Sequence, residues 1–152
     1  MASWKQLEAA EPELAARVRA TFAVRRHATL ATVRRDGSPR ISGTEVVFGE
    51  DGEVHLGMMP GSVKALDLLR DPRLALHCPT EDPPEDDPSA WAGDGKLAGR
   101  AVDVSDPERD GAALRFRVDV TEAVHIRVGA TGDHLVVEAW HEGRGVERHR
   151  RE

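Results

Sequence analysis

The apolar positions near the N-terminus have a helical spacing. Over residues 1–24, apolar side chains recur four or seven positions apart and predict one apolar stripe. The stripe consists of Leu7, Leu14, Val18 and Phe22. Pro12 suits the first turn of a helix but not its interior, so we expect a short helix and then a second one over residues 12–23. Ser3 and Gln6 have the spacing of a capping box, which predicts that the first helix starts at Ser3.

After Arg26 the spacing favours strands. Short runs of apolar and β-branched residues alternate with polar residues and are separated by turn signals. They predict strands over residues 28–33, 40–48, 53–58, 73–78, 96–104, 116–128 and 135–140. The alternation is clearest where Phe116, Val118 and Val120 would share one face. Asp36-Gly37 and residues 50–52 are typical of tight turns, so the first three strands should form a meander.

Three other segments separate or follow these strands. Residues 62–70 predict a short helix, with Leu66 and Leu69 facing inward. Residues 79–95 are rich in Pro, Asp and Glu, which predicts a solvated acidic loop, and residues 142–152 are polar and predict a tail. Strands that follow one another through short turns favour a mainly-β fold over an alternating α/β fold. We therefore expect an antiparallel β-barrel with flanking helices, in a single domain over residues 1–152.

The composition limits the classes of function. The 152 residues suffice for one domain, but only 39% are hydrophobic, so we expect the small core to be supported by a second copy in a homodimer. The net charge of −6 argues against nucleic-acid binding. The sequence has no apolar run long enough for a membrane span and no signal-peptide pattern. Cys78 is the only cysteine, which excludes an internal disulfide. A cytoplasmic location is the expectation.

One turn in the middle of the chain has the composition of an anion site. Gly61-Ser62-Val63-Lys64 lies between a predicted strand and the predicted helix. Free backbone N–H groups at the start of a helix, a hydroxyl and an ammonium would meet there, and together they suit a phosphate. An ordinary N-cap with a solvent-facing lysine is the competing interpretation. Lys64 favours the anion site, because a cation in the first helical turn opposes the helix dipole unless an anion is close.

Other familiar chemistries have no signature in the chain. Seven histidines are scattered, without His-x-x-x-His or Glu-x-x-His spacing on one predicted helix, so we expect no metal site. Cys78 precedes Pro79 and lacks an evident activating base, so no thiol nucleophile is expected. We find no Ser-His-Asp set and no paired carboxylates, and no catalytic residue is identified. That pattern fits a protein whose bound cofactor carries the chemistry.

Several motifs together resemble one known family. They are Leu30-Ala-Thr-Val33, Asp36-Gly-Ser-Pro39, Gly61-Ser-Val-Lys-Ala65 and Asp71-Pro-Arg-Leu-Ala-Leu76. This order is similar to that of the pyridoxamine 5′-phosphate oxidase-like, flavin-binding split-barrel proteins, most closely over residues 25–78. The resemblance resumes weakly at residues 97–102 and 135–140. It implies a six-stranded Greek-key split barrel, a homodimer and a flavin mononucleotide (FMN) between the subunits.

The resemblance also implies a set of cofactor-binding residues. Gly61, Ser62 and Lys64 would hold the FMN phosphate, and Ser42, Gly43 and Thr44 would line the edge of the ring. Met58 and Met59 occupy positions that contact the flavin in the family. Trp140 and Arg150 have the ten-residue spacing of the oxidase's C-terminal Trp and Arg. Trp140 is large and apolar, so core packing competes with a ring contact from the other subunit.

The sequence departs from the oxidase in its substrate pocket. The Arg and His that grip the vitamin B6 substrate fall on Val146 and Arg148 here, which argues against vitamin B6 oxidation. We therefore expect an FMN-dependent oxidoreductase that acts on an unidentified small organic substrate. One alternative is a reductase that uses the deazaflavin F420, whose acidic tail Arg25, Arg26 and Arg40 would bind. The other is a flavin- or haem-binding protein without turnover.

Overall fold

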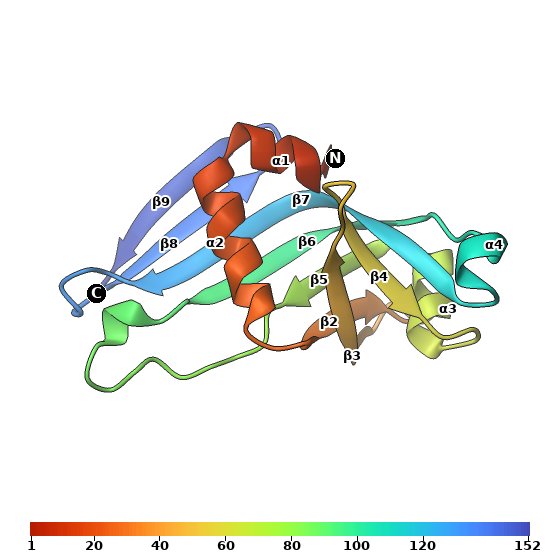
Figure 1. The fold of residues 1–152 in the computed structure, drawn as a ribbon, viewed down its shortest axis with the longest axis horizontal. Coiled ribbons are helices and arrows are strands. Elements are labelled where there is room, and N and C mark those ends of the chain that lie inside the picture. The colour runs from red at the N-terminus through yellow and green to blue at the C-terminus, as the bar shows by residue number, and fades with distance from the viewer.

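A six-stranded antiparallel barrel forms the centre of the computed structural model, which describes residues 1–152 (Figure 1). Its strands are β2 (His27–Val33), β3 (Pro39–Phe48), β4 (Val54–Met58), β5 (Arg73–His77), β6 (Asp94–Asp103) and β7 (Leu114–Val128). They pair in the order β4-β3-β2-β5-β6-β7, and β4 pairs with β7 to close the barrel. The predicted split barrel and the β2–β3–β4 meander are confirmed. Gly37 has a φ of 86°, as the predicted Asp36-Gly37 turn requires.

Strand β7 belongs both to the barrel and to a lateral extension. Its first residues pair with β4, whereas its last residues, from Glu122 onward, pair with β8 (Leu135–His141). A two-residue strand, β1 (Ala2–Ser3), pairs with the middle of β7. Strand β9 (Gly145–Arg151) pairs with β8 along its whole length, so the predicted polar tail is wrong. β9 is an edge strand with five exposed positions, and its charged residues do not alternate with apolar ones.

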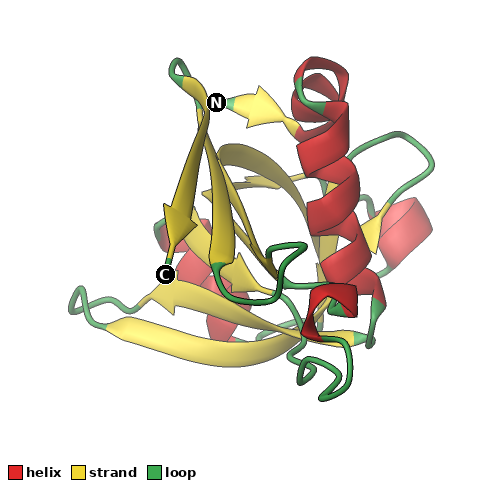
Figure 2. Cartoon of the chain, turned by 90° about the vertical axis from the view of Figure 1, so that its left-hand side faces the viewer, coloured by secondary structure: helices red, strands yellow, loops and turns green.

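Two N-terminal helices pack on the barrel and its extension. They are α1 (Trp4–Ala10) and α2 (Pro12–Ala23), which confirms the predicted break at Pro12. The capping box is present: Ser3 Oγ accepts from the Gln6 N–H at 3.2 Å, and Gln6 Oε1 accepts from the Ser3 N–H at 2.9 Å. Helix α2 lies against β6 and β7 (Figure 2). None of the helices has the length and apolar character needed to cross a bilayer.

The hydrophobic core fills the barrel and the space beneath α1 and α2. Phe116, Val118 and Val120 are all buried, as the alternation predicted. Trp4 of α1 packs edge-on against Phe48 of β3, with ring centroids 5.1 Å apart, which links the N-terminal helices to the barrel. Between β5 and β6 the acidic segment has no strand and contains only a 3₁₀ turn, Pro88–Ala90. A one-turn helix, α4 (Pro107–Asp110), joins β6 to β7.

Helix α3 (Val63–Arg70) lies outside the barrel, next to β2, and its orientation differs from the prediction. Ala65 and Leu68 are buried, whereas Leu66 and Leu69 are each 51% exposed. The predicted inward direction of Leu66 and Leu69 is therefore wrong. Two faces of this helix carry apolar residues at helical spacing, and the face that also bears the buried Asp67 packs on the barrel. Met59, Val63, Leu66 and Leu69 remain on the surface.

Candidate functional site

The start of helix α3 presents unused hydrogen-bonding groups. Gly61, with a φ of 73°, turns the chain from β4 into the helix. Ser62 is the N-cap, but its hydroxyl caps no backbone group, and its Oγ is buried without any hydrogen-bond partner. The first intrahelical bond runs from Leu66 N–H to Ser62 C=O, at 3.1 Å. The N–H groups of the preceding helical positions therefore have no acceptor within the helix, which leaves donors available to a ligand.

Lys64 brings a positive charge to the same place. Its Nζ donates a hydrogen bond to the Gly43 carbonyl on β3, at 2.7 Å. Lys64 forms no ion pair, so its charge is not neutralised by a neighbouring carboxylate. A cation in the first turn of a helix is disfavoured by the helix dipole, by roughly 0.3–1 kcal/mol. A bound anion at this point would offset that cost and would also accept from the Ser62 hydroxyl.

A groove of about 400 Å³ extends from this helix start across strands β3 and β4. Its volume falls within the roughly 300–1,000 Å³ of small-molecule sites. Residues that line it are His27, Gly43, Thr44, Glu45, Val47, Gly57, Met59, Ser62 and Lys64. The structure thus brings together five of the residues predicted for the cofactor site: Gly43, Thr44, Met59, Ser62 and Lys64. Gly61 precedes Ser62 in the turn.

Besides Gly61, four predicted residues do not line the groove. Ser42 does not line it, because its neighbours Ile41 and Gly43 are exposed on the outer face of β3 and the side chain between them points to the other face. Met58 is buried in the hydrophobic core, directly before the exposed Met59. Trp140 is also a core residue, and Arg150 is exposed on β9, where its guanidinium bonds to Glu152. Within one chain, β8 and β9 lie at the opposite end of the molecule from α3 (Figure 1).

Sequence reasoning missed four lining residues. Glu45 and Val47 share the outward face of β3 with Gly43, two and four positions further on, so the period-2 rule was the signal that could have found them. His27 is paired with Glu45 in the β2–β3 register, and its ring lies 3.7 Å from the Glu45 carboxylate. Gly57 of β4 also lines the groove. No motif marks His27 or Gly57, because their positions depend on strand register.

A buried carboxylate fixes helix α3 to the barrel behind the groove. Asp67 is 2% exposed, and its oxygens accept from Thr32 at 2.8 Å and from Arg40 at 2.7 Å. Arg70 also donates to Asp67, at 3.1 Å, and to the Val33 carbonyl, at 2.6 Å. Burial alone would raise the pKa of Asp67, but the hydrogen bonds from Arg40, Thr32 and Arg70 outweigh it and hold that pKa below its usual value.

These contacts bear on the arginines expected to bind an F420 tail. Arg40 is engaged with Asp67, and Arg25 lies 3.6 Å from the Glu81 carboxylate. Neither residue lines the groove, and Arg26 does not line it either. The groove's own ammonium is that of Lys64.

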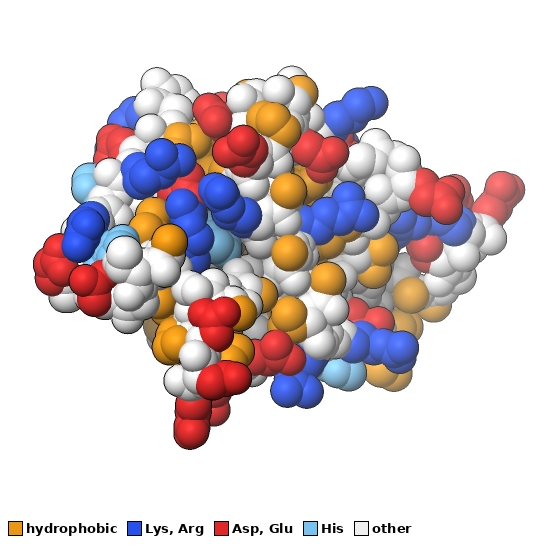
Figure 3. Space-filling model, turned by 60° about the vertical axis from the view of Figure 1, so that its left-hand side comes forward, with side chains coloured by type: hydrophobic (Ala, Val, Ile, Leu, Met, Phe, Trp, Pro, Cys, Tyr) orange, Lys and Arg blue, Asp and Glu red, His pale blue; other side chains and the backbone are white.

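A second buried carboxylate lies at the other end of the molecule. Glu138 of β8 accepts hydrogen bonds from Arg17 at 2.8 Å, from Arg127, and from Arg148 at 2.8 Å. Burial raises the pKa of Glu138, and the arginines, Arg148 foremost, more than reverse that effect, so its pKa is lowered overall. Basic side chains gather on the face that carries α2, β8 and β9 (Figure 3). All three arginines pair with the same carboxylate, which holds α2, β7, β8 and β9 together at this end of the molecule.

Comparison with solved structures agrees with this architecture. A pyridoxamine 5′-phosphate oxidase-related, FMN-binding protein from Nostoc punctiforme is 14% identical, with a TM-score of 0.61 over 100% of this chain and 98% of that one. PhzG from Burkholderia lata, solved with tetrahydrophenazine-1-carboxylic acid, is 12% identical, with a TM-score of 0.62 over 95% and 90% of the two chains. The haem storage protein HutZ from Vibrio cholerae is 17% identical, with a TM-score of 0.51 over 73% and 89%.

Sequence comparison adds no nearer relative. No protein-family model and no curated protein matches the chain. The likeness therefore lies in the three-dimensional structure, in the barrel and in the elements around it. The chain has the split-barrel fold of the pyridoxamine 5′-phosphate oxidase-like proteins.

Proposed function

We propose that this chain binds FMN in the groove beside helix α3 and acts as an oxidoreductase on a small organic substrate. The observation that carries this proposal is the start of α3, where the buried and unpartnered Ser62 hydroxyl, free N–H groups and the ammonium of Lys64 meet. A phosphate would accept from all three kinds of donor. The split-barrel neighbours, one of which is described as FMN-binding, support the choice of cofactor.

The floor of the groove suits a flat ring. Gly43 on β3 and Gly57 on β4 both line it, and a Cβ built at either position meets no atom within 4 Å. The open space in front of these glycines leaves the backbone accessible to a planar group. The side chains of Val47 and Met59 border that space, and they offer apolar contacts to an aromatic ring. When bound, the flavin would supply hydride chemistry, while the chain binds and orients it.

Replacing Lys64 by alanine should weaken FMN binding about 10- to 100-fold. The lost contact is a charge-assisted bond to phosphate, worth roughly 1.5–3 kcal/mol. Flavin fluorescence quenching in a titration measures the affinity. The matched control is Lys5→Ala, which removes an exposed lysine from α1, away from the groove, and should leave the affinity unchanged. Equal FMN affinity of wild type and Lys64→Ala would contradict the assignment.

A second variant tests the ring end of the groove. Gly57→Val places a side chain in open space, so the fold should be retained while the ring is blocked. We expect FMN affinity to fall by at least about tenfold, the effect of one lost contact of roughly 1.4 kcal/mol. Circular dichroism and thermal unfolding would verify that the variant stays folded. Undiminished FMN binding by folded Gly57→Val would place the ring elsewhere.

We also propose that a second copy of the chain covers the apolar stripe of α3, formed by Val63, Leu66 and Leu69. These three side chains are between 51% and 53% exposed, and Met59 continues the stripe into the groove at 78% exposed. Contiguous apolar surface of this kind is typical of an interaction site. A second subunit placed here would close the open side of the groove. The groove would then lie at the dimer interface, where the substrate is expected to bind.

The Leu66→Glu variant should shift the chain from dimer to monomer. A carboxylate buried without a partner at an apolar interface costs enough free energy to prevent dimer formation. The folding of the monomer should change little, because Leu66 is half-exposed and contributes little to the core. Sedimentation velocity over a concentration series measures the change. Ala16→Glu, which adds the same charge at an exposed position of α2, is the control. A wild-type chain that stays monomeric at its highest soluble concentration would contradict the dimer.

The visible spectrum distinguishes the cofactor classes. Purified protein should show oxidised-flavin bands, or acquire them when FMN is added. A preference for F420 over FMN would instead support the reductase alternative, and a Soret band would support a haem protein. Arg40, one of the cations expected for the F420 tail, is already bonded to Asp67, which favours FMN.

A further inference from the structure

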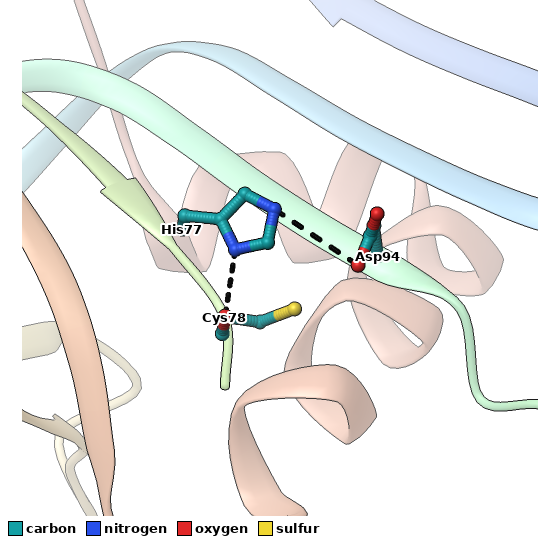
Figure 4. A group of neighbouring side chains, drawn as sticks. All are labelled: His77, Cys78 and Asp94. Atoms are coloured by element: carbon teal, nitrogen blue, oxygen red, sulfur yellow. Dashed lines mark hydrogen bonds and ion pairs between the residues drawn. The ribbon is translucent and has the colours of Figure 1, made fainter. Parts of the chain in front are cut away.

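Three side chains with metal-ligating atoms converge at the end of strand β5, outside the groove. They are His77, the last residue of β5, Cys78, which follows it, and Asp94, the first residue of β6 (Figure 4). One ligand atom from each lies within 4.8 Å of the others. No metal site was predicted from the sequence, because the histidines lack ligand spacing on any one helix. Here the ligands lie at the paired ends of β5 and β6, and Asp94 follows Cys78 by sixteen positions in the sequence.

The backbone ladder fixes this juxtaposition. His77 pairs with Lys96, and the ladder continues one residue further, because the Cys78 N–H donates to the Gly95 carbonyl at 2.9 Å. A Cβ at Gly95 would meet Thr21 Oγ1 of α2 at 2.0 Å, so only glycine allows the helix to pass this close. The Cys78 side chain is buried, while His77 and Asp94 keep 38% and 29% of their side chains exposed. The cluster is therefore buried on the Cys78 side and accessible to solvent on the side of His77 and Asp94.

The hydrogen bonds of His77 select its tautomer. Its Nδ1 lies 2.7 Å from the Cys78 carbonyl oxygen, which only accepts, so Nδ1 carries a proton. In the neutral ring Nε2 then holds a lone pair. A hydrogen bond from Nδ1–H to a backbone carbonyl is the arrangement that orients histidines as metal ligands. Figure 4 shows Nε2 turned toward Asp94.

The Asp94 oxygen that faces Nε2 accepts no hydrogen bond either. Asp94 Oδ1 lies 3.9 Å from Nε2, beyond hydrogen-bond distance, and this oxygen is buried without a partner. A lone pair and a carboxylate oxygen repel each other, so a cation between them would satisfy both. Cys78 Sγ accepts from the Gly95 N–H at 3.2 Å, and burial raises the pKa of this thiol. A bound metal would displace the thiol proton.

We propose that His77, Cys78 and Asp94 form a binding site for a divalent transition ion of the zinc class. Imidazole nitrogen and thiolate sulfur favour such ions over Mg²⁺ or Ca²⁺. Tetrahedral zinc with bonds of about 2.0–2.3 Å separates its ligand atoms by roughly 3.3–3.8 Å. The ligand atoms lie within 4.8 Å of one another, so a bound ion would draw them together by up to roughly 1–1.5 Å, through rotation of the partly exposed His77 and Asp94 side chains. Water supplies the fourth ligand on the open side.

Cobalt(II) is the probe that tests this site. The untagged full-length chain is treated with chelator, kept reduced and titrated with Co²⁺. We expect binding of one equivalent, with a thiolate-to-cobalt charge-transfer band in the near ultraviolet and visible bands of tetrahedral intensity. Zn²⁺ should displace the cobalt and abolish the bands. An absence of the charge-transfer band at one equivalent, or binding of neither ion, would overturn the proposal.

Variants assign the ligands. His77→Gln and Asp94→Asn each remove a half-exposed ligand and should weaken Co²⁺ binding by at least about tenfold, as even outer-shell changes do. Cys78→Ser should also eliminate the charge-transfer band, and thermal unfolding identifies any loss of folding at this buried position. His149→Gln is the matched control, because that histidine is exposed on β9. Retained affinity in His77→Gln, or an equal loss in His149→Gln, would overturn the assignment.

Discussion

The Asp67→Asn variant is expected to lose about 3 kcal/mol of its free energy of unfolding at neutral pH. Asp67 is buried and compensates the charges of Arg40 and Arg70, which are mostly shielded from water. Removing one partner from such a network leaves uncompensated buried charge, which typically costs 3–5 kcal/mol. The partial solvation of both arginines puts the expected loss at the lower limit. In a chain of this size the midpoint of thermal unfolding should fall by roughly 6–12 °C.

Calorimetry or denaturant unfolding measures this loss. The control is Asp86→Asn, which makes the same chemical change in the exposed loop, where the carboxylate has no hydrogen-bond partner. We expect the control to change stability by no more than about 0.5 kcal/mol. A loss equally small in Asp67→Asn would mean that the network does not hold helix α3 on the barrel.

Glu138→Gln should have the second largest effect, roughly 2–3 kcal/mol. Three guanidinium groups converge on this buried carboxylate, and the neutral amide would leave their mutual repulsion unbalanced. The loss is smaller than for a fully buried pair because Arg148 is 61% exposed and Arg17 is 38% exposed, so water screens part of the repulsion. Urea unfolding at pH 7 measures the difference. Glu147→Gln on the exposed edge strand β9 is the control.

The same two variants predict how stability depends on pH. The pKa values of Asp67 and Glu138 are lowered by folding. Each carboxylate therefore adds stability that is fully present above its unfolded pKa, about 3.9 for Asp and 4.3 for Glu. That stability is lost as the pH falls through the lower pKa of the folded state. The gap between wild type and variant should be constant from pH 6 to 7 and should shrink on acidification below about pH 4. A gap independent of pH would contradict this account.

Much of the fold could be predicted from residue patterns alone. The Ser3 capping box, the Pro12 break and the alternation at Phe116 are local signals, and the structure confirms each of them. Strand β9 was missed because an edge strand buries little, so its sequence lacks the apolar alternation of an inner strand. The prediction of which face of α3 is buried was wrong, because two faces of this helix carry apolar residues. What decides between them is Asp67, whose partner Arg40 comes from a different element, 27 positions earlier.

The candidate site could be predicted only in part, for a similar reason. Ser62 and Lys64 lie two positions apart in the sequence, at the start of α3, and both line the groove. Glu45 and His27 enter through strand register, which the sequence does not specify directly. Met58 and Met59 could not be distinguished from sequence, since adjacent residues of an extended segment face opposite sides and either could have faced the groove. The cluster of His77 and Asp94 likewise depends on the pairing of β5 with β6.

The most direct test of the FMN assignment compares the affinities of FMN and riboflavin, which differ only in the phosphate. In the wild-type chain FMN should bind at least about tenfold more tightly, because the phosphate engages Ser62, Lys64 and the helix start. In the Ser62→Ala, Lys64→Ala double variant, FMN affinity should fall most of the way to that of riboflavin, because only the backbone N–H groups of the helix start still contact the phosphate, and riboflavin affinity should not change. Equal binding of FMN and riboflavin by the wild-type chain would contradict the account.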